Sequence, residues 1–167
     1  MNTNGKKIIL GSNSPRRKEL LGGLDIEFTV DTGNTFEEVY DPATPHEHIP
    51  EVLSEGKSYG FHRALEANEI LITSDTLVLC GDRVMGKPHS REEAIDMLRY
   101  LSGREHKVIT AVTIRDRNRC TTSSDTAIVH FKELSDSEIA YYVDTYKPFD
   151  KAGAYGIQEW IGYIGIG

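Results

Sequence analysis

The chain has 167 residues, of which 38% are apolar and 27% charged, and its formal net charge is −7 at pH 7. These values are typical of one globular domain that is large enough to bury a core. The acidic balance argues against a general nucleic-acid binder, which normally carries a basic face. No apolar stretch approaches the ~18 residues of a membrane span, so no membrane partner is expected.

Residues 1–5 lack the apolar region of a signal peptide, and export is not expected. The two cysteines, Cys80 and Cys120, form neither a disulfide framework nor a metal-spaced pair. The histidines are scattered and show no zinc-binding spacing. A reduced, cytoplasmic compartment is the simplest interpretation.

Residues 8–21 combine a short apolar strand, a hydroxyl-rich turn and a helix start. Ser14 stands where an N-cap belongs, and Pro15 takes the first helical position. Three cations follow in the first turn, where they oppose the helix dipole: Arg16, Arg17 and Lys18. An anion docked among these cations, the free N–H groups and the hydroxyls of Ser12 and Ser14 would remove that conflict. The turn therefore predicts a phosphate site, with a solvated basic turn as the alternative.

The next segments alternate between strand and helix patterns without a linker or repeat. Residues 26–30 alternate as a half-buried strand. Residues 32–47 form a long polar loop, of a length that is usually functional or mobile. A helix is expected over residues 47–65, although Gly56 and Gly60 weaken it.

The second half of the chain continues the alternation. Its expected elements are a buried strand over residues 70–80 that returns through Val84, a helix from Ser90 to Leu101, paired strands over 108–114 and 127–131, a helix from Ser135 to Tyr146, and a strand at 163–167. Both helices begin with a Ser-x-x-Glu capping box. The pattern predicts an α/β fold with a mixed sheet.

Asp75 interrupts an otherwise apolar strand. A carboxylate in such a position is costly unless it is paired, hydrogen-bonded or metal-bound. The residues alone leave two interpretations open. Asp75 is either a strand-end acid satisfied by local donors, or a general base or metal-bridging acid at the floor of a cleft.

Two later stretches carry weaker signals. Lys87, between Gly86 and Pro88, reads by itself as a surface lysine. The small residues of 150–158 allow a backbone to approach a ligand closely, and Gln158 has the donor and acceptor that reading a base edge requires. A tight, well-packed turn is the alternative.

Four stretches, in this order, resemble the motifs of the Maf family of nucleoside triphosphate pyrophosphatases: Ser12-Asn13-Ser14-Pro15-Arg16-Arg17-Lys18-Glu19-Leu20-Leu21, Ser74-Asp75-Thr76, Gly86-Lys87-Pro88 and Asp150-Lys151-Ala152-Gly153-Ala154-Tyr155-Gly156-Ile157-Gln158. Residues 94–103 also follow the family pattern, so the resemblance covers nearly the whole chain. It implies a mixed, elongated, twisted sheet flanked by helices, in two lobes with a central cleft, similar to the inosine-triphosphate pyrophosphatases.

The resemblance also implies an activity, hydrolysis of dTTP, UTP and modified pyrimidine analogues to a monophosphate and pyrophosphate, and a role in restraining septum formation. The implied site is catalytic Asp75, which activates water, with Lys87 and Lys57; phosphate-binding Ser12, Ser14 and Arg16; specificity residues Arg17, Thr76 and Gln158; and metal ligands Asp75 and Glu37. Glu38 can substitute for Glu37, because the preceding loop varies in length. Gly56 departs from the family, which commonly has a charged residue there. Magnesium is the expected metal, with manganese as the alternative.

Family members continue beyond the position of Gly167 with a strand, a loop and a helix. The expected organisation is therefore a single Maf-like domain over residues 1–167 that lacks these elements. This leaves a second hypothesis, a nucleotide-binding or cell-division-regulating protein with impaired catalysis. A third, an inosine-triphosphate pyrophosphatase, would not predict Arg17, Thr76 and Gln158 together. A small-molecule nucleotide is the expected partner, and homodimerisation stays open.

Overall fold

The structure, a computed structural model, describes residues 1–167 and contains one mixed sheet. Its strands are β1 (Lys7–Leu10), β2 (Phe28–Val30), β3 (Glu69–Cys80), β4 (Arg83–Met85), β5 (Glu105–Arg115) and β6 (Cys120–His130). The helices are α1 (Pro15–Gly22), α2 (Ile49–Tyr59), α3 (Arg91–Leu101), α4 (Asp136–Tyr146) and α5 (Trp160–Gly165), with short 3-10 turns at His46–His48 and Ala152–Ala154.

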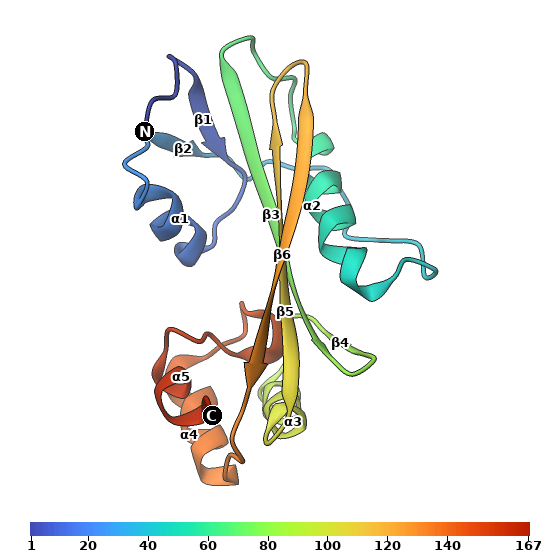
Figure 1. The fold of residues 1–167 in the computed structure, drawn as a ribbon, viewed down its shortest axis with the longest axis vertical. Helices are drawn as coiled ribbons and strands as arrows, with labels where there is room; N and C mark the ends of the chain where they lie inside the picture. The colour runs from blue at the N-terminus through green and yellow to red at the C-terminus, as the bar shows by residue number, and fades with distance from the viewer. The chain divides into compact units, whose positions relative to one another are not determined.

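The strand order is β2-β1-β3-β5-β6, and β4 pairs with β3 (Figure 1). β1 runs parallel to both β2 and β3, with Ile8 opposite Phe28 on one side and Ile70 on the other. β3 and β4 are antiparallel and form the hairpin expected from the sequence. The predicted mixed α/β sheet flanked by helices is confirmed.

The chain divides into two compact units. Unit 1 comprises Met1–Asp75 and Thr110–Asp125, and unit 2 comprises Thr76–Ile109 and Thr126–Gly167. Three long strands, β3, β5 and β6, contribute residues to both units. The unit boundary on β3 falls between Asp75 and Thr76, inside one of the sequence motifs.

Unit 1 carries α1 and α2, which lie on opposite sides of β3 in Figure 1. α1 has no fully buried residue, although Arg17 and Leu21 are partly buried. α2 buries Ile49 and Leu53. The helix predicted over residues 47–65 is too long, because the chain leaves α2 at Gly60 and Phe61 forms an antiparallel bridge with Asn34.

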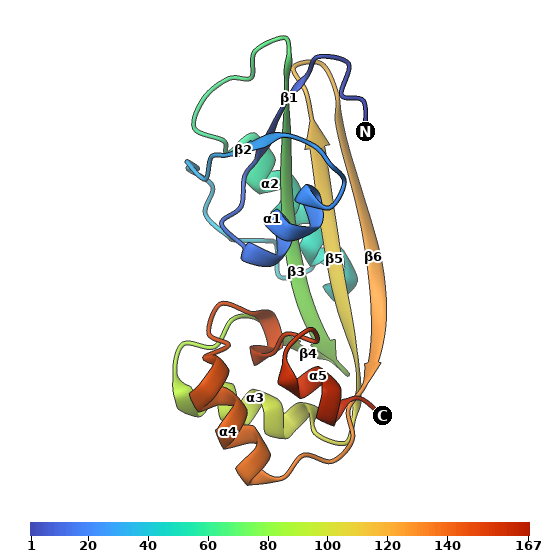
Figure 2. The ribbon, with the colours of Figure 1, turned by 90° about the vertical axis from the view of Figure 1, so that its left-hand side faces the viewer.

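Unit 2 has a core built from β3, β4 and three helices. Val78, Met85, Leu98, Tyr142 and Ile161 belong to this core. α3 and α4 pack against each other, and the three helices lie on one side of β5 and β6 in Figure 2. Both predicted capping serines are confirmed, since the Ser90 and Ser135 hydroxyls accept the N–H of the residue three positions on.

The C-terminal prediction is wrong. Residues 163–167 were expected as a strand, whereas residues 160–165 form α5. Ile161 is buried, the Trp160 ring packs on Tyr141, and Gly162 lets the helix approach the Ile157 carbonyl, where a Cβ would lie 1.7 Å away. Glycine and isoleucine alternate at residues 164–167, and this two-residue period is the one expected of a strand. None of the helices has the length and apolar character needed to span a membrane.

Candidate active site

The turn between β1 and α1 forms the first part of the site in unit 1. Gly11 donates its N–H to the Ile72 carbonyl of β3, and a Cβ there would lie 3.1 Å from Thr73 Cγ2, so the turn is held tightly against β3. The Ser14 hydroxyl accepts the Arg17 N–H, which confirms the predicted N-cap. The Ser12 hydroxyl accepts the Ser14 N–H at 3.2 Å. The first turn of α1 contains no acidic residue, so its dipole is free to meet an anion.

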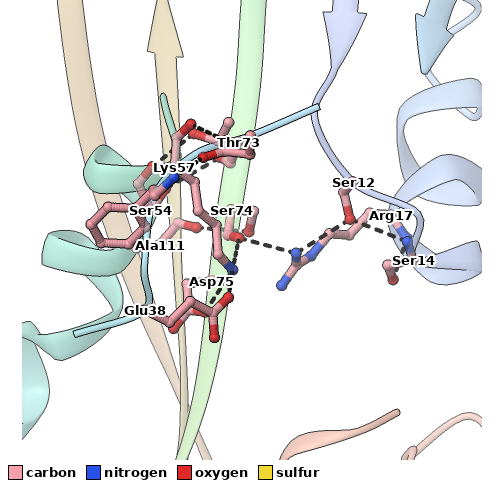
Figure 3. A network of polar contacts seen from close by, with 12 residues as sticks. Ser12, Ser14, Arg17, Glu38, Ser54, Lys57, Thr73, Ser74, Asp75 and Ala111 are labelled. Carbon is pink, nitrogen blue, oxygen red and sulfur yellow. Dashed lines mark hydrogen bonds and ion pairs between the residues drawn. The ribbon is translucent and has the colours of Figure 1, made fainter. Parts of the chain in front are cut away.

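Arg17 connects this turn to β3. Its Nη1 donates to the Ser74 carbonyl at 3.0 Å and to the Ser12 hydroxyl at 3.4 Å (Figure 3). Burial lowers the pKa of Arg17, while Asp75 and Glu38 act in the opposite direction. Arg16 points elsewhere and pairs with Glu19 at 3.2 Å on the exposed surface of α1.

Lys57, from α2, joins two carboxylates. Its Nζ lies 3.0 Å from Asp75 Oδ1 and 3.1 Å from Glu38 Oε1 (Figure 3). The Asp75 side chain is only 13% exposed, whereas that of Glu38 is 60% exposed. Lys57 also donates to the Ser74 carbonyl at 3.4 Å, the acceptor that Arg17 uses. Two cations therefore converge on the Ser74–Asp75 segment.

The electrostatics of Asp75 suit a general base. Burial raises the pKa of Asp75 above its ordinary value, Lys57 opposes that rise by charge and hydrogen bond, and the nearby Glu38 adds to it. A carboxylate with a raised pKa binds a proton more readily than a free one.

A network of buried hydroxyls, which the sequence analysis did not identify, fixes α2 against the sheet. The Thr73 hydroxyl donates to the Ser54 carbonyl at 2.8 Å, and the Ser54 hydroxyl lies 2.8 Å from that of Thr113. The Ser74 hydroxyl donates to the Ala111 carbonyl at 2.7 Å. These bonds set the register of α2, and hence of Lys57, on β3. Small hydroxyl residues within the apolar strand were the available signal.

Glu38, rather than Glu37, contacts Lys57. The contact that the structure gives Glu37 is through its backbone carbonyl, which accepts the Val39 N–H. Glu38 and Asp75 offer hard carboxylate oxygens of the kind that divalent cations prefer, and in this structure the Lys57 ammonium lies between them. No group of three or more acidic, histidine or cysteine side chains forms a metal cage in this protein.

Thr76, Lys87 and Gln158 belong to unit 2. Lys87 and Gln158 are exposed, and Thr76 is partly buried. The Gly153 N–H donates to the Gly86 carbonyl at 3.1 Å, so the lysine motif and the 150–158 segment lie side by side. Gly153 has a φ of +71°, and a Cβ there would lie 2.9 Å from Val78 Cγ2, which explains the glycine.

Tyr155 connects the 150–158 segment to the buried side chains of unit 2. Its hydroxyl lies 2.6 Å from Nε2 of the buried His106 on β5, and both rings contact Phe131. The Gly156 N–H donates to the Tyr142 hydroxyl, which in turn donates to Glu159 Oε1. The segment before Gln158 is therefore rigidly tied to β5 and α4.

Comparison with known proteins agrees with these motifs. Residues 7–166 match the family described as Maf-like protein. A dTTP/UTP pyrophosphatase of Bacteroides thetaiotaomicron is 48% identical over 163 residues, covering 96% of this chain and 83% of that protein. Proteins of the same name from Parabacteroides distasonis and Porphyromonas gingivalis are also 48% identical, over 96% of this chain and 83% and 81% of their own lengths.

Among solved structures, a HAM1 protein from Coxiella burnetii aligns with a TM-score of 0.46 and 13% identity, over 75% of this chain and 73% of that chain. So distant a likeness indicates nothing about function. The matched residues include the β1–α1 turn, Asp75, Lys87 and the segment that ends at Gln158, and the chain belongs to the Maf family.

Proposed function

We propose that this protein hydrolyses nucleoside triphosphates, dTTP and UTP foremost, to a nucleoside monophosphate and pyrophosphate. The observation that carries the proposal is the buried Asp75, paired with Lys57 and flanked by the Arg17 guanidinium. Relatives at 48% identity that bear the name dTTP/UTP pyrophosphatase support it. The same relatives favour an enzyme over a binding protein with impaired catalysis.

The phosphates bind at the β1–α1 turn in this proposal. Ser12, Ser14 and Arg16 provide hydroxyls, an N-terminal helix dipole and a guanidinium fork, which together form a usual anion site. The Arg16–Glu19 pair is exposed and weak, so it can open when a phosphate competes for the guanidinium.

Hydrolysis then proceeds by attack of water on the α-phosphorus. Asp75 accepts a proton from the water, the new P–O bond forms, and the bond between the α-phosphorus and the bridging oxygen breaks. Pyrophosphate leaves with that oxygen, and Lys57 and Lys87 offset the negative charge that develops. The raised pKa of Asp75 makes its carboxylate a better proton acceptor for this step.

A divalent cation, magnesium foremost and manganese as the alternative, is held by Asp75 and Glu38 in this proposal. Glu38 takes the place expected for Glu37, because its carboxylate is the one beside Lys57. When bound, the cation neutralises phosphate charge and orients the triphosphate. Asp75 and Glu38 would supply two of its oxygen ligands.

The base is read by Arg17, Thr76 and Gln158. The Gln158 amide is exposed at the end of a segment tied to β5 through Tyr155. Its donor and acceptor match the polar edge of a uracil or thymine ring. Thr76 follows the catalytic residue directly on β3, and Arg17 contacts the carbonyl of Ser74.

The test is product release from a nucleotide panel. The purified protein, with Mg²⁺ and separately with Mn²⁺, is given dTTP, UTP, CTP, ATP, ITP and 7-methyl-GTP, and both pyrophosphate and orthophosphate are measured. We expect pyrophosphate from dTTP and UTP, at rates well above those for the purines. Orthophosphate as the direct product, or preferential turnover of ITP or 7-methyl-GTP, would contradict the proposal.

A further inference from the structure

The segment that carries Glu38 lies on the C-terminal half of α2. The Asn34 side-chain amide donates to the Lys57 carbonyl at 2.6 Å, and its oxygen accepts the Phe36 N–H at 2.8 Å. The Thr35 N–H donates to the Gly60 carbonyl at 2.9 Å. The segment that leads to Glu38 is thus bonded, through the Asn34 side chain and the Thr35 N–H, to two carbonyls at the C-terminal end of the helix that carries Lys57.

The Phe36 ring occupies space that only glycine leaves open. A Cβ on Gly56 would lie 2.3 Å from Phe36 Cζ and 2.4 Å from Cε2. A Cβ on Gly60 would lie 2.5 Å from Phe36 Cβ and from Asn34 Oδ1. Gly56 stands inside α2, where glycine costs up to about 1 kcal/mol relative to alanine. The contact with Phe36 explains why position 56 is a glycine despite this cost.

Glu38 cannot hold its own position. Its side chain is 60% exposed, and an exposed ion pair such as that with Lys57 contributes about 0–1 kcal/mol at most. Phe36 is partly buried and its packing does not depend on charge, and the exposed hydrogen bonds of Asn34 support it. They are the contacts able to place the Glu38 carboxylate.

We propose that Phe36 is a positioning residue: its ring packs on Gly56 and its Cβ lies against Gly60, which holds Glu38 beside Lys57 and Asp75. This inference rests on the proposed function, in which Glu38 and Asp75 act together. Phe36 does not touch the reacting atoms in this account. It acts by fixing the two residues of backbone that lead to Glu38.

The test introduces Gly56→Ala, Phe36→Ala and the double variant, with Gly22→Ala as the control. Gly22 is also a helical glycine, but a Cβ there meets nothing within 4 Å. Three quantities are measured: kcat and KM for dTTP with Mg²⁺, the Tm, and amide hydrogen exchange at Thr35 and Phe36. The exchange measurement needs no substrate.

We expect Gly56→Ala to lose exchange protection at both amides and to lower kcat about 10- to 100-fold, with a smaller change in KM and little change in Tm. Phe36→Ala should lower kcat by a similar factor. The double variant should lower kcat no more than either single variant does, because both changes break the same contact. Phe36→Leu, which keeps an apolar contact, should recover part of the loss.

Wild-type kcat in Gly56→Ala, or additive losses in the double variant, would overturn the inference. So would unchanged protection at Thr35 and Phe36 in both single variants. A wild-type protein that hydrolyses no nucleotide would instead contradict the proposed function. In that case the exchange data alone decide whether Phe36 holds the segment on α2.

Discussion

The chemistry of the candidate site depends on the environment of one residue, Asp75. Burial and Glu38 favour its neutral form, and Lys57 favours the charged form. A carboxylate whose pKa is raised in this way binds a proton more readily than an exposed aspartate. The position of Lys57 relative to Asp75 therefore controls the pH at which the proposed enzyme works.

The pH dependence of turnover should respond to Lys57. Lys57→Met removes the contact that lowers the pKa of Asp75, so that pKa rises further. Because Asp75 must be deprotonated to accept a proton, the acid limb of the kcat profile should move to higher pH. The profile of dTTP hydrolysis from pH 5 to 9 measures this, with Lys132→Met, an exposed lysine of unit 2, as the matched control. An acid limb that stays in place, or moves to lower pH, would contradict the assignment.

The sequence singled out Asp75 and Lys57, which the structure places in contact, and it favoured Glu37 over Glu38, whereas Glu38 is the glutamate beside Lys57. Both glutamates lie in a loop without a periodic pattern, and in our proposal a contact distant in sequence, Phe36 on Gly56, places Glu38. The same holds for Thr113, whose hydroxyl meets Ser54 across 59 positions. A polar or charged residue within an apolar strand can be recognised in a sequence, but the distant residue that it contacts cannot.

Elements with local start and stop signals were predicted well. α3 and α4 begin at their capping serines, and the turn after Cys80 forms the expected hairpin. Residues 108–114 lie in β5 and residues 127–130 in β6, whereas Phe131 lies just beyond β6, and both strands are longer than predicted. Their outer parts are rich in polar residues, so the apolar pattern ends before the ladder does.

The link between β5 and the 150–158 segment predicts an acid-sensitive element. Burial lowers the pKa of His106 to about 4, helped by the charge of His130. The unfolded chain takes up this proton near pH 6.5, so the contribution of a neutral His106 is fully present above that pH. It is lost as the pH falls from about 6.5 to about 4.

The loss of stability caused by His106 can be measured by replacing both His106 and its partner Tyr155. In the double variant His106→Phe with Tyr155→Phe, no polar group is left unpaired by the change. The Tm of the double variant should therefore fall less than that of the wild type between pH 7 and pH 4. Thermal unfolding followed by circular dichroism at several pH values measures the difference. Parallel Tm curves for the two proteins would contradict the assignment.

At the scale of the whole molecule, the proposed site residues are divided between two units that share three strands. Unit 1 holds the β1–α1 turn, Lys57, Glu38 and Asp75, and unit 2 holds Thr76, Lys87 and Gln158. A central cleft between two lobes, implied by the resemblance to the Maf family, stays a prediction. Because the formal net charge of the chain is −7, the local gathering of cations in unit 1 is not a consequence of a basic overall composition.

The central claim is that Asp75 activates water for hydrolysis of a nucleoside triphosphate. The most direct test compares pyrophosphate release from dTTP by the wild type, Asp75→Asn and Asp144→Asn. The last is the same change at an exposed aspartate paired with Arg91. We expect Asp75→Asn to lose about 10²- to 10⁴-fold in kcat, while Asp144→Asn keeps wild-type turnover and all three proteins are folded. Wild-type turnover by a folded Asp75→Asn protein would contradict the account.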